Sequence, residues 1–217
     1  MVIPLKILII SDTHNSEAYI QRAAEVASKD TSIRVLLHLG DVGSKTLASI
    51  RSVFRGLEIY IIAGNHDRRK ELEDSCIPIL EDGIIPAAGV TFVTKSLPRI
   101  PVAGKKYENR LVNLIIMAQV LCKPVILLSH CGGKIACNRW WLQAIEGGHA
   151  RATARMKPDL EIHGHKHPSR LKMYFDDTYE WWPMPNEPIE GDNVYNAAFN
   201  VLVLDTKKLQ VEVKTWT

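Results

Sequence analysis

Five groups of polar residues have the types and spacing that metal chemistry needs. They are Asp12 with His14, Asp41, Asn65 with His66 and Asp67, His130, and His165 with His167. Carboxylate, carboxamide and imidazole side chains are the ligands that hard or borderline divalent cations take in proteins. The set supplies more ligands than one ion needs and enough for two, so the sequence predicts a site for two divalent cations.

Other kinds of catalytic chemistry have no comparable pattern in the chain. No group forms a Ser-His-Asp arrangement or a glycine-rich nucleotide loop. A single histidine after a strand is more often a hydrogen-bonded loop residue than a ligand, but its recurrence in four of the five groups favours a shared metal site. We expect His38, His149 and His163, which lie outside the groups, to have structural roles, with His38 and His163 near enough in sequence to support the ligands.

Each group follows a segment with the pattern of a buried β-strand. These strands are predicted at residues 5–11, 34–39, 58–63, 125–129 and 160–163, with further pairs at 84–87 and 90–94 and at 200–204 and 210–215. Helices are predicted at residues 16–28, capped by Ser16, and at 44–55, 68–75, 107–121 and 140–156, the last interrupted around Gly147 and Gly148. The early alternation of strands and helices is the doubly wound parallel pattern, in which polar residues after the strands meet in one crevice.

The length and composition are those of an ordinary globular chain. We predict one domain, residues 1–217, because 46% hydrophobic and 24% charged residues fit a folded protein of this length. The net charge of +3 is too small for a protein that wraps nucleic acid. The apolar stretch at residues 2–10 is too short to cross a bilayer and lacks the features of a secretory signal. No disulfide spacing relates Cys76, Cys122, Cys131 and Cys137, so we predict reduced thiols and a cytoplasmic protein.

One segment combines aromatic and loop-forming residues. Residues 179–192 are rich in Trp, Pro, Glu and Asn, which predicts a long surface loop. Two tryptophan pairs, Trp140 with Trp141 and Trp181 with Trp182, are expected in core or subunit contacts. Stacking on a nucleobase or an aryl leaving group is their alternative role.

The motifs, taken in order, resemble those of the calcineurin-like metallophosphoesterases. The matching segments are D-x-H at residues 12–14, G-D at 40–41, G-N-H-D at 64–67, a lone histidine at 130 and G-H-x-H at 164–167. Their spacing is compact, as in the small single-domain phosphodiesterases of that family. The resemblance implies an α/β fold, namely a four-layer αββα sandwich of two packed mixed β-sheets flanked by helices.

The resemblance also implies which residues bind the ions. Asp12, His14, Asp41 and His167 would hold the first ion, and Asp41, Asn65, His130 and His165 the second. A shared carboxylate, Asp41, would screen the repulsion between two dications. Mn²⁺ is the expected ion, with Ni²⁺, Fe²⁺, Zn²⁺, Co²⁺ and Mg²⁺ as alternatives.

The implied reaction is hydrolysis of a phosphodiester by a metal-bridging hydroxide, because two cations acidify the water that they share. Asn65 would stabilise charge on the phosphoryl oxygens, and His66, oriented by Asp67, would protonate the leaving alkoxide. The implied partner is a small phosphoester substrate. No membrane is expected as a partner, nucleic acid is not favoured, and a homo-oligomer stays open.

Alternatives within and outside this chemistry remain open. The same site serves phosphomonoesterases, protein phosphatases and a nuclease of double-strand-break repair, although the modest charge and short chain argue against the nuclease. A metal-free scaffold resembling the retromer subunit is the non-catalytic alternative, but such scaffolds lose ligands that this sequence keeps. After G-H-x-H, residues 168–194 intervene and Tyr195-Asn196-Ala197-Ala198 stands where small phosphodiesterases have an Asn-Pro-Gly-Ser turn, so their substrate specificity does not carry over.

Overall fold

Strands and helices alternate along most of the chain. The structure, a computed structural model, describes residues 6–87, 89–97, 104–121, 123–132, 140–165, 189–191 and 193–214, without the side chains of 140–142 and 189–191. Within these ranges the strands are β1 (Lys6–Ile10), β2 (Ile33–His38), β3 (Glu58–Ile61), β4 (Gly83–Ala87), β5 (Val90–Lys95), β6 (Val125–Ser129), β7 (Leu160–His163), β8 (Ile189–Gly191), β9 (Val194–Asn196), β10 (Val201–Asp205) and β11 (Gln210–Lys214). The helices are α1 (Glu17–Lys29), α2 (Ser44–Val53), α3 (Arg69–Asp74), α4 (Gly104–Leu121) and α5 (Trp140–Met156).

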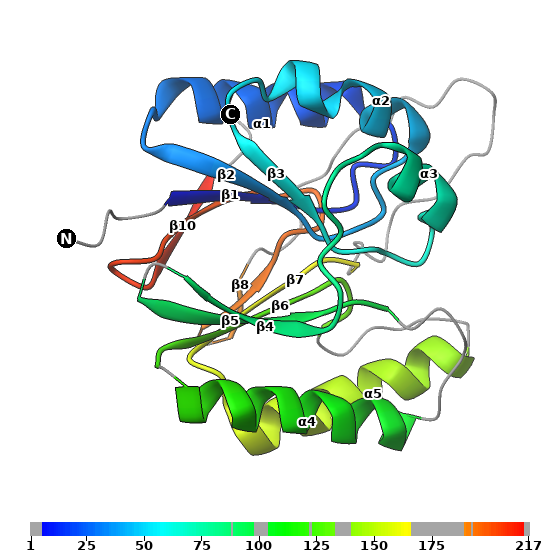
Figure 1. Ribbon diagram of the computed structural model, residues 1–217, viewed down its shortest axis with the longest axis vertical. Coiled ribbons are helices and arrows are strands. Elements are labelled where there is room, and N and C mark those ends of the chain that lie inside the picture. The colour runs from blue at the N-terminus through cyan, green and yellow to red at the C-terminus, as the bar shows by residue number, and fades with distance from the viewer. Residues whose placement is uncertain are drawn as a thin grey trace.

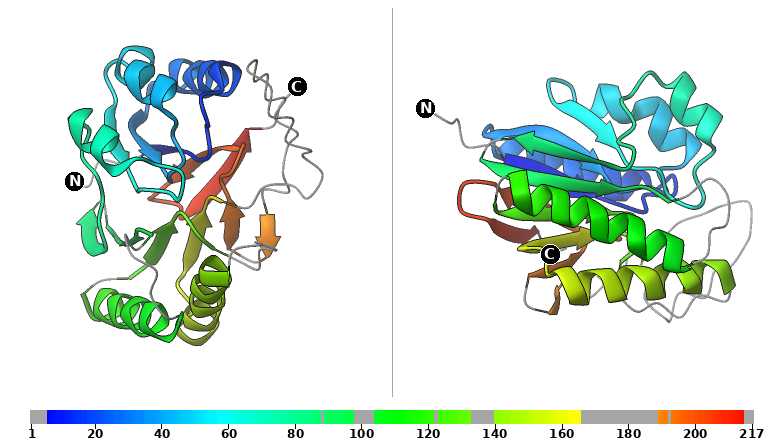
Figure 2. Two further views of the ribbon diagram at one scale, coloured as in Figure 1. Left: turned by 90° about the vertical axis from the view of Figure 1, so that its right-hand side faces the viewer. Right: turned by 60° about the horizontal axis from the view of Figure 1, so that its bottom comes forward.

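Two β-sheets lie face to face between two layers of helices (Figure 1). The first sheet has the order β11-β10-β1-β2-β3 and the second β4-β5-β6-β7-β9-β8. Both sheets are mixed: β1, β2 and β3 run parallel beside antiparallel β10, and β5, β6, β7 and β9 run parallel between antiparallel β4 and β8. Helices α1 and α2 cover one sheet and α4 and α5 the other, as Figure 2 shows from two further directions. The predicted four-layer αββα sandwich is confirmed.

The central strands are buried on both faces, which explains their continuous apolar sequences. In β1, Ile7 and Ile9 belong to the core between the sheets, whereas Leu8 and Ile10 belong to the core under α1 and α2. Strands covered on both sides need apolar residues at every position. The predicted ligands follow these apolar segments, where the chain leaves the strand.

The first helix begins directly after the first ligand loop. Ser16 caps α1 by accepting a hydrogen bond from the Tyr19 backbone N–H, as the sequence predicts. The buried Tyr19 hydroxyl donates to the carbonyl of Asn200 at 2.6 Å, which ties this helix to the chain just before β10. The loop at residues 11–16 is thereby fixed at both ends.

The predicted interruption of the last helix is wrong, because α5 runs unbroken through Gly147 and Gly148. A methyl group at Gly148 would lie 2.4 Å from the carbonyl oxygen of Gly104, and one at Gly104 would lie 2.1 Å from that of Ala144. These glycines let α4 and α5 pack closely, so their tertiary contact outweighs the low helix propensity of glycine, about 1 kcal/mol per residue. The same contact explains why α4 begins at Gly104, earlier than predicted.

The predicted surface loop at residues 179–192 contains a strand, β8 at Ile189–Gly191, which corrects part of that prediction. Its three residues have no recognisable pattern of their own, and pairing with β9, itself paired with β7, decides their structure. The rest of that loop, Trp181, Trp182, Cys122, Cys137 and His167 lie outside the described residues, and so do the side chains of Trp140 and Trp141.

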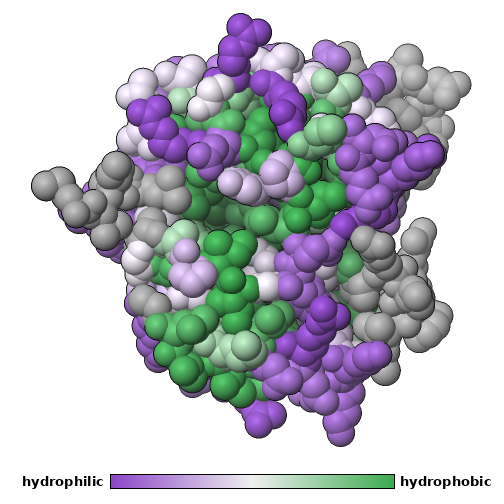
Figure 3. All heavy atoms as spheres, in the orientation of Figure 1, coloured by the Kyte–Doolittle hydropathy of each residue, from purple (hydrophilic) through white to green (hydrophobic). Residues whose placement is uncertain are grey.

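Exposed apolar side chains gather on α4. Ile116, Met117, Val120 and Leu121 are all exposed, with Val120 at 81%, and apolar surface covers this part of the molecule in Figure 3. Exposed apolar patches of this kind often mark surfaces that contact another protein chain. A homo-oligomer stays a prediction. Among the helices in the described ranges, none is long and apolar enough to cross a bilayer.

Candidate metal centre

The loops after β1, β2, β6 and β7 bring four predicted ligands together. Asp12, Asp41, His130 and His165 each offer one ligand atom, and these atoms lie within 4.8 Å of one another. The first three residues are buried and His165 is partly buried. The backbone N–H of His165 donates to Asp12 Oδ2 at 2.8 Å, which joins loops 153 residues apart in the sequence. The two sheets thus contribute to one cluster.

Asp41 occupies the centre of this cluster. Its Oδ2 lies 3.8 Å from His14 Nε2 and 3.6 Å from His130 Nε2, and it has no hydrogen-bond partner in the described part of the chain. Two ligand atoms that each lie about 2.1 Å from one ion are about 3 to 4 Å apart. The spacing on both sides of Asp41 Oδ2 therefore fits a carboxylate shared by two cations.

The ring orientation of His130 also favours a cation. Its Nδ1–H donates to the carbonyl of Leu39 at 2.7 Å, so a neutral ring presents the lone pair of Nε2 to the amide oxygen of Asn65 at 2.9 Å. Asp41 Oδ2 is the third acceptor at this point. Three acceptors that face one another repel unless a proton or a metal ion lies between them, and a divalent cation fits this donor set.

The carboxylate of Asp12 is held so that one oxygen faces His14. Its Oδ2 accepts hydrogen bonds from the Ser11 hydroxyl at 2.6 Å and from the backbone N–H of His165. Its Oδ1 lies 3.8 Å from His14 Nε2. Asp12, His14 and Asp41 thus come together as the resemblance implies, and His167, the fourth predicted ligand of the first ion, lies outside the described residues.

Four of the predicted ligands have a left-handed backbone. The φ angles of Asp12, His14, Asp41 and His165 are 58°, 41°, 56° and 64°. This conformation costs about 1 kcal/mol or more in a residue other than glycine and persists only where neighbouring contacts hold it. Here the Asp12 N–H donates to the carbonyl of Gly40 at 2.9 Å and the His14 N–H donates to that of Asp41 at 3.1 Å. Strain of this kind at four predicted ligands agrees with a functional role of these loops.

Two motif glycines make room for the carboxylates. A methyl group at Gly64 would lie 2.2 Å from Asp41 Oδ1, and one at Gly164 would lie 2.0 Å from Ser11 Oγ and 2.8 Å from Asp12 Oδ2. The backbone therefore has to pass against both carboxylates. This explains the glycines of the G-N-H-D and G-H-x-H motifs in physical terms.

The Asp67 carboxylate accepts hydrogen bonds from the backbone of two ligand loops. Its Oδ2 accepts the backbone N–H groups of Asp41 at 2.9 Å and Gly64 at 2.8 Å, and its Oδ1 accepts that of Val42 at 2.8 Å. The sequence interpretation did not include this contact, and the predicted orientation of His66 by Asp67 stays a prediction. The carboxylate fixes the loops after β2 and β3 relative to each other.

His66 lies at the open side of the cluster. Its side chain is exposed, and its ring centroid is 5.6 Å from that of His14 with the planes 73° apart. Its backbone N–H donates to Asp41 Oδ1 at 2.8 Å, which fixes the residue beside the central carboxylate. From this place the imidazole can reach a group that leaves toward solvent.

The electrostatics of the cluster favour bound positive charge. Burial, with a contribution from neighbouring Asp12, raises the pKa of Asp41 to about 7. Burial opposes the charged form of His130, but the carboxylates of Asp41 and Asp12 outweigh it and raise the pKa of this histidine. Both shifts have the sign expected of a buried negative region, which either protons or metal ions neutralise.

His38 links two ligand loops. Its Nδ1 accepts the backbone N–H of Gly40 at 3.1 Å, which places the ring proton on Nε2, and Nε2–H donates to Thr13 Oγ1 at 3.0 Å. The Thr13 hydroxyl in turn donates to the carbonyl of Val42 at 2.7 Å. The supporting role expected of His38 thus takes the form of a neutral imidazole between the loops after β1 and β2.

This neutral ring predicts a loss of stability in acid. Burial lowers the pKa of His38 to about 4 from the ordinary 6.5. Between these values the unfolded chain binds the proton and the folded chain does not, so the free energy of unfolding falls by about 1.4 kcal/mol per pH unit as the pH drops. Denaturant titration of metal-free protein gives the free energy of unfolding at pH 7 and at pH 5. The decrease between these pH values should be about 2 kcal/mol larger in the wild type than in His38→Gln. Equal losses would exclude this role.

Glu146 is a site residue that the sequence analysis missed. It projects from α5, is 3% exposed, and places Oε1 3.8 Å from His165 Nε2. Burial raises the pKa of this carboxyl to about 7. It stands within a helix rather than after a strand, so the pattern that found the other residues had no means of finding this one.

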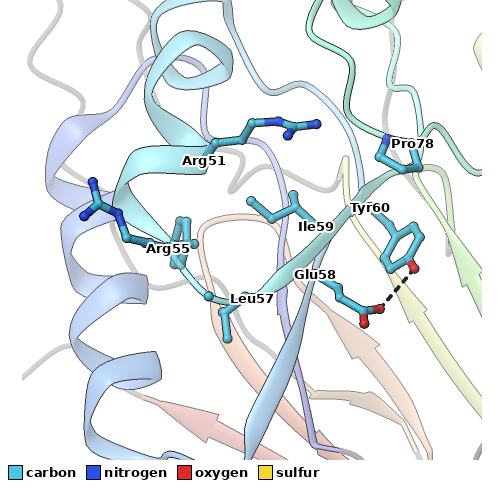
Figure 4. Close-up of a pocket in the computed structure, with 9 residues that line it drawn as sticks. Arg51, Arg55, Leu57, Glu58, Ile59, Tyr60 and Pro78 are labelled. Atoms are coloured by element: carbon cyan, nitrogen blue, oxygen red, sulfur yellow. Dashed lines mark hydrogen bonds between the residues drawn. The ribbon is translucent and has the colours of Figure 1, made fainter.

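A separate pocket lies away from the cluster. It has a volume of about 350 Å³ and is lined from the end of α2 and from β3, with Arg51, Arg55 and Tyr60 among its residues (Figure 4). The Tyr60 hydroxyl donates to Glu58 at 3.2 Å, and Arg55 points away from the centre of the pocket. It is lined by none of the predicted site residues in the described ranges. The candidate site therefore remains the cluster at the carboxyl ends of the strands.

Solved structures share this fold at low sequence identity. The protein TT1561 of Thermus thermophilus superposes with a TM-score of 0.62 at 13% identity over 97% of this chain and 98% of the other. An archaeal phosphodiesterase has a TM-score of 0.50 at 16% identity over 97% and 99%. A putative 5'-nucleotidase from Staphylococcus aureus has a TM-score of 0.55 at 13% identity over 98% of this chain and 53% of its own. These matches establish the likeness of the fold.

Comparison with sequence families gives a more specific result. No curated protein sequence matches the chain significantly. The family model of the calcineurin-like phosphoesterase superfamily domain matches residues 5–177, a span that contains all the predicted ligands. The chain therefore belongs to the calcineurin-like phosphoesterase superfamily, a metal-dependent family of hydrolases that act on phosphate esters.

Proposed function

We propose that this hydrolase is a two-metal phosphodiesterase that acts on a small phosphodiester with Mn²⁺ as its activating ion. The observation that carries the proposal is the buried Oδ2 of Asp41, which lies between His14 and His130 at 3.8 and 3.6 Å with no hydrogen-bond partner in the described ranges. A single oxygen flanked by two imidazoles suits a ligand common to two ions. We further propose that the chain acts as one domain in the cytoplasm.

We propose the two ligand sets that the family resemblance implies. Asp12 and His14 would hold the first ion with Asp41 and His167, and Asn65, His130 and His165 would hold the second with Asp41. When bound, the ions supply positive charge at the phosphate and lower the pKa of a coordinated water toward about 7. The backbone hydrogen bonds to Asp12, Asp41 and Asp67 keep these carboxylates in place before substrate binds.

His66 would provide the proton for the leaving group. An alkoxide is a poor leaving group, so its departure needs a proton at the oxygen as the phosphorus–oxygen bond breaks. The exposed ring of His66 next to His14 supports this role, and Asn65 would stabilise negative charge on the phosphoryl oxygens. The single negative charge that a phosphodiester shares over its two non-bridging oxygens suits the positive potential that a loaded site would have.

Two chromogenic substrates test the proposal in one assay. Protein loaded with Mn²⁺ is expected to hydrolyse bis-(p-nitrophenyl) phosphate faster than p-nitrophenyl phosphate, because a diester offers a diesterase site a second ester group to bind. Both esters release p-nitrophenolate, whose visible absorbance reports the two rates on one scale. Preference for the monoester would make the protein a phosphomonoesterase, and failure on both would support the metal-free scaffold.

A further inference from the structure

Helix α5 places a buried carboxylate next to the cluster. Glu146 is 3% exposed, and its Oε1 has no hydrogen-bond partner among the described residues. Burying a carboxylate without a partner costs several kcal/mol, so a folded protein keeps one only where something compensates it. The imidazole Nε2 of His165 lies 3.8 Å from Glu146 Oε1.

His165 lies between Glu146 and the other candidate ligands. Its ring centroid is 5.0 Å from that of His130, and its backbone N–H is bonded to Asp12. Glu146 does not belong to the group of ligand atoms within 4.8 Å of one another, although His165 does. Glu146 therefore lies next to the ligand His165 and is not itself a member of the ligand group.

We propose that Glu146 positions His165 as a metal ligand by accepting a hydrogen bond from Nε2–H, which leaves Nδ1 to bind the ion. The proposal rests on the proposed two-metal function. Histidines that bind metals almost always donate their other ring N–H to a carboxylate, a carbonyl or water, which fixes the tautomer and the ring orientation. The present 3.8 Å is about 1 Å longer than a charge-assisted hydrogen bond, a gap that a small rotation of the side chain closes.

A second carboxylate–imidazole pair on the same helix provides a matched control. His149, one turn along α5, is fully buried, and its Nε2 lies 2.7 Å from Glu161 Oε1 on β7. Neither residue belongs to the ligand group. Glu161→Gln therefore makes the same chemical change as Glu146→Gln in a buried pair that joins helix and sheet and lies outside the ligand group.

Titration of metal-free full-length protein with Mn²⁺ by calorimetry tests the proposal. For Glu146→Gln we expect one of the two binding steps to weaken about 10- to 100-fold, the usual effect of removing such a partner, while Glu161→Gln stays within about threefold of the wild type. Thermal unfolding of the metal-free wild type and Glu146→Gln distinguishes the positioning role of Glu146 from a structural role. The amide removes a buried charge whose Oε1 has no hydrogen-bond partner among the described residues, so Glu146→Gln should melt at or above the wild-type temperature.

Three results would overturn the proposal. Wild-type affinity at both steps in Glu146→Gln would exclude the positioning role and leave the proposed function intact. A lower melting temperature of the metal-free variant, together with weaker binding, would show that Glu146 serves the fold. A wild-type protein that binds no Mn²⁺ would refute the two-metal function and this proposal with it.

Discussion

Asp41→Asn is expected to weaken the binding of both metal ions by more than about 100-fold each and to abolish measurable phosphodiester hydrolysis. Loss of an outer partner of a ligand already costs about 10- to 100-fold in metal affinity, and Asp41 contributes directly between His14 and His130. The amide has the same shape and still accepts the His66 N–H, but it lacks the charge that offsets two dications. Metal content after dialysis, measured by mass spectrometry, checks the result.

The fold should survive this change. Burial already disfavours the charged form of Asp41, whose pKa is about 7, so a neutral amide removes a cost in the metal-free protein. Asp30→Asn is a suitable control, because Asp30 pairs with Lys6 at 2.7 Å on the surface and takes no part in the cluster. Two full equivalents of metal in Asp41→Asn would exclude a shared ligand.

His66→Ala is expected to slow hydrolysis of a dialkyl phosphodiester by about 10² to 10⁴ while both metal ions remain bound. The exposed ring lies beside His14 but outside the group of candidate ligands, so its removal takes away a proton donor without opening the metal site. Steady-state rates on the dialkyl ester and metal content measured on the same sample give both quantities.

The leaving group provides the control for this variant. p-Nitrophenolate departs without a proton, so bis-(p-nitrophenyl) phosphate should lose far less rate than the dialkyl ester in His66→Ala. Equal losses on the two substrates would argue for a role in binding or in loop structure, since loss of a general acid slows the ester with the more basic leaving oxygen more strongly.

The sequence by itself determined the layers of the fold and the residues to consider as ligands. Strands covered on both faces must be apolar at every position, as in β1, so each strand and the polar residue that ends it are visible locally. The motif order then identified the superfamily. Asp12 and Asp41 follow neighbouring parallel strands of one sheet and His130 and His165 those of the other, so the strand pattern already predicts that each pair shares one edge of its sheet. The packing of the two sheets then brings the two pairs together.

Only the tertiary structure decided how these residues are held. Asp67 bonds to backbone groups 25 and 26 residues away, and the ring of His130 is oriented by a carbonyl 91 residues away. Glu146 reaches the cluster from the middle of α5, whose continuity through Gly148 depends on contact with α4. Local sequence encodes burial and secondary structure, whereas hydrogen bonds and close packing between distant segments depend on the relative placement of the elements, which no short stretch of chain contains.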